Sequence, residues 1–199
     1  MDRRPAPALL VLLVGLAMLA LSACSNDEPD PATGQQATQT TTAAGSAGGG
    51  ASTGAAKPCT TTDLKADLTK QDFGDVALLT LTNAAKQACT LNGWADVRVL
   101  DPTGSAVDIP TTKVDQPGPP VEVVLEPQHS AFAGIKWKAC DKSSASCQAG
   151  NGIEVVPPGG AGYVDADLVG FAEPEKVNIT MASIQIGSLQ PATQGVVAW

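Results

Sequence analysis

Cys24 sits in a context that suits attachment of a lipid to its sulfur. Arg3 and Arg4 come first, then the apolar run PALLVLLVGLAMLALSA over residues 7–23, then the cysteine. Basic, hydrophobic and small-residue regions in this order are typical of a secretory signal peptide. The last four residues, LSAC, fit the bacterial lipobox, in which the cysteine receives a diacylglycerol and becomes the acylated first residue. We therefore predict that Cys24 is a lipid anchor.

The alternative for residues 1–23 is an uncleaved transmembrane helix, in which Cys24 plays no part. Such a helix would be near the lower length limit for spanning a bilayer. A lipoprotein signal peptide over residues 1–23 fits the lipobox better. One acyl chain holds a protein to a membrane only weakly, whereas two or three hold it firmly. We expect an exported protein anchored to the outer face of the cytoplasmic membrane, in the cell envelope.

Residues 24–57 contain almost only Ala, Gly, Ser, Thr, Gln, Pro and acidic residues after the cysteine. This composition cannot bury enough apolar surface to offset the entropy lost on ordering. A flexible coil of this length spans about 30 Å. We predict a disordered tether that carries one domain over residues 58–199.

Four further cysteines lie in that domain, and an exported chain most often oxidises such residues in pairs. Four cysteines allow three connectivities. Cys140 and Cys147 flank the short polar loop DKSSAS, which favours their pairing with each other and leaves Cys59 to pair with Cys89. The rival is a metal site that includes His129, but zinc ligands come in tight pairs such as CxxC, which this sequence lacks. We expect two disulfides and no metal.

Catalysis finds little support in the sequence. His129 is the only histidine, the GxSxG nucleophile motif is missing, and His129 is expected in an exposed turn. Asp165 and Asp167 lie two residues apart, a spacing that usually gives a solvated strand face rather than an acid and base pair. No GxGxxG, Walker loop or HExxH pattern occurs. We expect no enzyme activity and no cofactor.

Short strand-like segments must position these residues. Alternating or β-branched runs separated by Pro and Gly predict strands at residues 64–69, 76–83, 97–100, 121–125, 131–137, 153–156, 177–186 and 195–199. Helical periodicity is not sustained anywhere. About 140 residues are enough for one compact core, so the pattern predicts an all-β domain, an antiparallel sandwich or barrel.

The charge balance limits the partners. The chain carries a net charge of −8, which disfavours nucleic acid as a partner. Lys136, Lys138 and Lys142 nevertheless gather near the Cys140–Cys147 loop. A loop ordered by a disulfide before binding would take an acidic partner such as an anionic cell-wall polymer. The plainer alternative is a solvated loop whose bridge only stabilises the fold.

Trp199 is the other candidate binding residue, because it either closes the last strand or stays exposed for a partner. We expect a monomeric binding or interaction module, the partner being a wall polymer or an envelope protein. The alternatives are a structural envelope component without a ligand, and a hydrolase whose site follows no known motif.

Four segments of the domain resemble a family of actinobacterial secreted proteins and lipoproteins of unknown function. They are PCTTTDLKADL, LLTLTNAAKQACTLNGWADVRVLDPTG, VVLEPQHSAFAGIKW and GIEVVPPGG. The resemblance implies an immunoglobulin-like sandwich on the cell surface, and it matches Cys59 and Cys89 to the family's first two cysteines. It implies no activity, catalytic residue or ligand. The chain departs from the family pattern at GWAD and NAAKQ and lacks a late cysteine near GFAEPEKV, so its second bridge must be local or different.

Overall fold

The computed structural model describes residues 56–172 and 179–199 of the chain. The proposed signal peptide, Cys24 and almost all of the tether therefore lie outside the described residues. Within them the protein is nearly all-β, with one short 3-10 helix, η1 (Thr61–Asp63). No helix in the described parts is long and apolar enough to cross a membrane.

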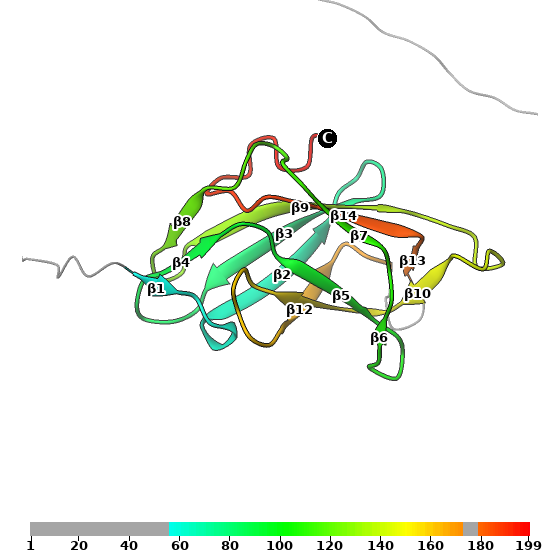
Figure 1. Ribbon diagram of the computed structural model, residues 1–199, viewed down its shortest axis with the longest axis horizontal. Helices are drawn as coiled ribbons and strands as arrows, with labels where there is room; N and C mark the ends of the chain where they lie inside the picture. The colour runs from blue at the N-terminus through cyan, green and yellow to red at the C-terminus, as the bar shows by residue number, and fades with distance from the viewer. Residues whose placement is uncertain (1–55, 173–178) are drawn as a thin grey trace, which may run out of the picture. The chain divides into compact units, whose positions relative to one another are not determined.

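The strands follow one another along the chain as short segments (Figure 1). They are β1 (Lys57–Pro58), β2 (Leu64–Lys70), β3 (Val76–Asn83), β4 (Cys89–Asn92), β5 (Asp96–Leu100), β6 (Ala106–Val107), β7 (Thr111–Val114), β8 (Glu122–Leu125), β9 (Ser130–Lys138), β10 (Gln148–Gly150), β11 (Gly152–Val156), β12 (Val164–Val169), β13 (Ile179–Met181) and β14 (Ser183–Gly187).

Nine of these strands form one sheet in the order β6-β5-β11-β12-β2-β3-β9-β14-β7. Two smaller sheets, β1-β4-β8 and β10-β13, accompany it and appear at opposite sides of the domain in Figure 1. The large sheet curls so that its two ends approach each other. Lys113 on β7 pairs with Asp96 on β5 at 2.8 Å, and the indole of Trp94 donates to the carbonyl of Val114 at 2.9 Å.

The core lies on one face of this sheet because apolar residues alternate with polar ones along its strands. Leu68 on β2 pairs with Leu79 on β3, which pairs with Ala133 on β9. All three are buried, as are Leu91 and Leu125 of the small sheet β1-β4-β8. The five residues come from two sheets but belong to one hydrophobic cluster. The alternation visible in the sequence therefore fixes which face is buried.

The predicted antiparallel pairing of the strands is wrong at three places. The pairs β1 with β4, β12 with β2, and β14 with β7 are parallel. Hairpins force antiparallel pairing, whereas strands far apart in the chain can meet in either direction. The three parallel pairs all join strands that are separated by other strands, so local turn signals could not reveal them.

Two of the predicted strands also differ. Residues 177–186 give two strands, β13 and β14, within the described part of this segment. Residues 195–197 lie in a turn and residues 198–199 have no regular secondary structure, so this segment is not a strand. Val196 is nevertheless fully buried, because the segment packs by single side chains instead of pairing along a sheet edge.

Candidate functional site

Lys136 and Lys138 lie two residues apart on β9 and so project from the same face of the large sheet. On the neighbouring strand β14, Gln185 pairs with Lys136 and Ser183 with Lys138. Together with Trp137 these residues line a groove of about 210 Å³, which we call the β9–β14 groove. Among the described residues, no Asp or Glu side chain lines it.

Trp199 reaches the same face. It is half-buried, its indole donates to the carbonyl of Val196 at 2.8 Å, and the ammonium of Lys136 lies 5.9 Å from its ring centre. Lys136 also donates to the carbonyl of Trp199 at 3.4 Å. Trp199 therefore holds Lys136 in place beside the groove and does not close a strand.

Gly134 allows this docking, because the C-terminal segment covers the point where its side chain would be. A Cβ at residue 134 would lie 2.1 Å from the carbonyl oxygen of Val196 and 3.0 Å from the Trp199 indole nitrogen. We predict that Gly134→Ala displaces this segment and costs about 1–3 kcal/mol of stability. Hydrogen exchange at the Val196 and Ala198 amides should accelerate, while Gly118→Ala, where a Cβ meets nothing within 4 Å, should leave it unchanged. Unchanged exchange in the Gly134 variant would contradict the close docking.

The bridged loop is less basic than the sequence suggests. Cys140 and Cys147 form the predicted disulfide, and Lys142 is exposed within it but does not line the groove. Its neighbour Asp141 accepts hydrogen bonds from the hydroxyl and the backbone N–H of Ser143, which lower the pKa of that carboxyl. Asp141 thus stays anionic and offsets Lys142, so Lys136 and Lys138 carry the positive charge of the site.

The groups considered for catalysis stand apart from this groove. His129 is exposed in the turn before β9, as predicted, and Asp165 and Asp167 are exposed on β12. Glu154 on β11 is a buried carboxylate that the sequence did not single out, and its Oε2 lies 2.9 Å from Arg98 Nη1. The two atoms are not aligned for a hydrogen bond, so the contact is an ion pair. Over residues 56–172 and 179–199, no three His, Cys, Asp or Glu side chains are grouped to hold a metal.

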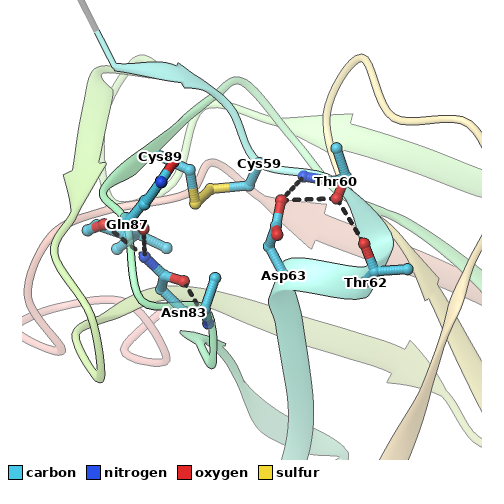
Figure 2. The surroundings of a disulfide bond; sticks show 9 residues. Cys59, Thr60, Thr62, Asp63, Asn83, Gln87 and Cys89 are labelled. Carbon is cyan, nitrogen blue, oxygen red and sulfur yellow. Dashed lines mark hydrogen bonds between the residues drawn. A yellow bond between two sulfur atoms is a disulfide. The ribbon is translucent and has the colours of Figure 1, made fainter.

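The second predicted disulfide, Cys59–Cys89, joins β4 to the residue that follows β1 (Figure 2). The N–H of Cys59 donates to the carbonyl of Thr90 at 2.9 Å, which continues the pairing of β1 with β4. Thr60 then caps η1: its N–H and hydroxyl both donate to Asp63, and these hydrogen bonds lower the pKa of the Asp63 carboxyl. The start of the domain is therefore fixed by a covalent bond and by a cap.

Asn83 holds the loop that leads to Cys89. It is fully buried, and its amide nitrogen donates to the carbonyls of Gln87 and Leu125, each at 2.8 Å. Its amide oxygen accepts from the N–H of Ala85 at 2.9 Å (Figure 2). Asn83 thus ties the residue 84–88 loop to β8, a role that no spacing in the sequence announces.

A larger groove of about 340 Å³ lies beside this disulfide. Two lysines, Lys57 and Lys86, and the carboxylate of Asp63 contribute to its lining. We call it the staple groove. It is the natural rival to the β9–β14 groove for an anionic ligand, although Asp63 lies within it.

The fold and the grooves define a disulfide-stapled, nearly all-β domain with shallow surface sites. The chain belongs to the family described as a domain of unknown function (DUF4232), whose family model matches residues 59–190. This match spans both disulfides and the β9–β14 groove, and it supports the resemblance to a family of unknown function. No curated protein and no solved structure matches the chain.

Proposed function

We propose that the domain is a binding module for an anionic polymer of the cell envelope. The observation that carries the proposal is the β9–β14 groove, where the half-buried Lys136 and the exposed Lys138 lie beside the uncharged Ser183 and Gln185. The chain has a net charge of −8, so a local cationic site attracts an anionic partner while the rest of the protein surface repels that partner. Partner choice is thereby confined to one face of the large sheet.

Three features support binding rather than catalysis as the activity. His129 is the only histidine of the chain and lies exposed in a turn. Asp165 and Asp167 are exposed on β12, and the buried Glu154 is paired with Arg98. General acid and base catalysis needs such groups near a common reacting atom. We expect the module to act as a monomer and without a cofactor.

We also propose that the domain is a two-layer sandwich of the immunoglobulin-like kind. The support is that the small sheet β1-β4-β8 shares its core with the large one: Leu91, Val123 and Leu125 belong to the same cluster as Leu79 and Leu81. The parallel pairs described above set this arrangement apart from a purely antiparallel sandwich.

Replacing Lys136, Lys138 and Lys142 together with glutamine tests the binding function. We expect retention on isolated anionic wall polymer at low salt to fall by about tenfold or more, since each surface contact with a charged polymer is worth roughly 1 kcal/mol. Retention of the natural chain should also fall as salt rises.

The comparison variant replaces Lys57, Lys65 and Lys86 with glutamine, which removes the same charge from exposed residues and includes both lysines of the staple groove. This variant should keep most of the retention. Equal losses in the two triple variants would mean that only net charge matters, and a larger loss in the comparison variant would move the site to the staple groove. Unchanged, salt-insensitive retention in both would favour a structural envelope component without a specific ligand.

The proposal places the module at the outer face of the cytoplasmic membrane through a lipid on Cys24. We predict that Cys24→Ser releases the protein from membranes or blocks its maturation, because the thioether needs this sulfur. Metabolic labelling with radioactive palmitate, followed by fractionation of the cells, measures both effects. Label in the serine variant equal to that in the natural chain would defeat the anchor.

A further inference from the structure

We infer that the β9–β14 groove binds a phosphate group, so that the polymer is a polyol or sugar phosphate rather than a polyuronate. This inference rests on the proposed function and gives the chemical class of its ligand. It follows from the kind of hydrogen-bond donors in the groove and from their arrangement on two strands.

Four donor groups surround the groove. Lys136 and Lys138 supply ammonium groups from β9, and their register partners Gln185 and Ser183 supply an amide and a hydroxyl from β14. Two residues along a strand span roughly 6.7 Å, and neighbouring strands lie roughly 4.8 Å apart. The Cβ atoms of these four residues therefore stand at the corners of a compact rectangle, from which the side chains can reach a bound group from several directions.

A phosphodiester suits this arrangement because its oxygens are arranged tetrahedrally and can accept from several sides at once. Lysine binds phosphate as a point charge with three rotatable donors, so two lysines can share one phosphate without a fixed plane. The hydroxyl of Ser183 and the amide of Gln185 can then donate to the open sides of the two charged oxygens. Ser183 and Gln185 carry no charge and do not attract an anion from a distance. Their hydrogen bonds therefore give the site its specificity for phosphate.

A carboxylate suits it less. Its two oxygens accept hydrogen bonds mainly in their own plane, whereas a phosphate oxygen accepts from several sides. Donors that come from two strands can therefore reach a carboxylate less completely than a phosphate. A uronate in the groove would gain the same charge attraction but fewer well-directed hydrogen bonds.

The test uses the full chain, purified in detergent, and titrates it with poly(glycerol phosphate) and with polygalacturonate. The two polymers are compared at equal concentrations of negative charge and at the same moderate salt. We expect poly(glycerol phosphate) to bind about tenfold more tightly, the difference that one directed hydrogen bond to a charged group gives. Lys138→Gln should weaken binding of both polymers.

Ser183→Ala and Gln185→Ala change no charge. They therefore distinguish directed hydrogen bonding to phosphate from general charge attraction. Each should weaken binding of poly(glycerol phosphate) by about threefold to tenfold and leave polygalacturonate nearly unchanged. Ser144→Ala is the matched control, because it removes an exposed hydroxyl from the bridged loop outside the groove. This control should bind both polymers as the natural chain does.

Equal affinity for the two polymers, with both weakened by Lys138→Gln, would overturn the phosphate inference and leave the proposed function standing. A preference for phosphate that survives both Ser183→Ala and Gln185→Ala would overturn its placement in this groove. No binding of either polymer, or binding that Lys138→Gln does not weaken, would overturn both the inference and the proposed function.

Discussion

Asn83→Asp is expected to lower the free energy of unfolding by about 3 kcal/mol or more at neutral pH. The aspartate has nearly the shape of the asparagine but no N–H to donate to the carbonyls of Gln87 and Leu125. It would bring a charge into a fully buried site and place it against two carbonyl oxygens. Urea denaturation of the two proteins measures the loss.

The pH dependence of this variant has a definite sign. Burial and the neighbouring carbonyls raise the pKa of the new carboxyl in the folded state above its unfolded value. The protonated carboxyl can donate one of the lost hydrogen bonds. The difference in the free energy of unfolding between the variant and the natural chain should therefore shrink as pH falls towards 4 and grow as pH rises.

Asn92→Asp is the matched control, since it makes the same change at an exposed residue of β4. It should alter stability by no more than about 0.5 kcal/mol. A loss at Asn83 as small as the loss at Asn92 would show that the buried hydrogen bonds do not hold the loop.

Removing the Cys59–Cys89 bridge should cost more than removing the Cys140–Cys147 bridge. The first closes a separation of 30 residues and the second one of 7. The chain-entropy relation gives about 3.6 and about 2.4 kcal/mol for the two loops. Cys59 and Cys89 are also buried, whereas the loop between Cys140 and Cys147 is exposed, so the cavity left by alanine adds to the difference.

Thermal and urea denaturation of the two double alanine variants measure these losses. The first variant should also show faster hydrogen exchange at the backbone amide of residue 59 and around β4, because the bridge ties the start of the domain to that strand. The second variant should show faster exchange only near its own loop. A larger loss of stability for the second variant would contradict the assignment of Cys59–Cys89 as the main covalent staple.

The sequence predicted the buried strands well because their alternation records burial directly. Residues 76–83 form β3 with the predicted bounds, and the alternation of β9 separates its buried residues from Lys136 and Lys138. Residues 195–199 misled the prediction. An apolar run signals burial but not pairing, and here Val196 and Trp199 pack without a ladder. The parallel pairing of β12 with β2 depends on contacts between distant segments, which one sequence does not display.

The site was predictable only in part, for a similar reason. Lysines two apart on a strand share a face, so Lys136 and Lys138 could be grouped from their spacing. Ser183 and Gln185 join them only through the register of β14 on β9, and Lys142 falls outside the groove. Asp141 was overlooked, although it directly precedes Lys142 in the sequence and offsets its charge.

Backbone chemical shifts of the isotope-labelled chain, recorded while a short oligo(glycerol phosphate) is added, test the central claim most directly. If the β9–β14 groove is the binding site, the largest shifts should fall on residues 136–138 and 183–185 and saturate together. The amides of Lys57 and Lys86 in the staple groove should stay nearly still. Shifts confined to the staple groove, or no saturable shift anywhere, would contradict the claim.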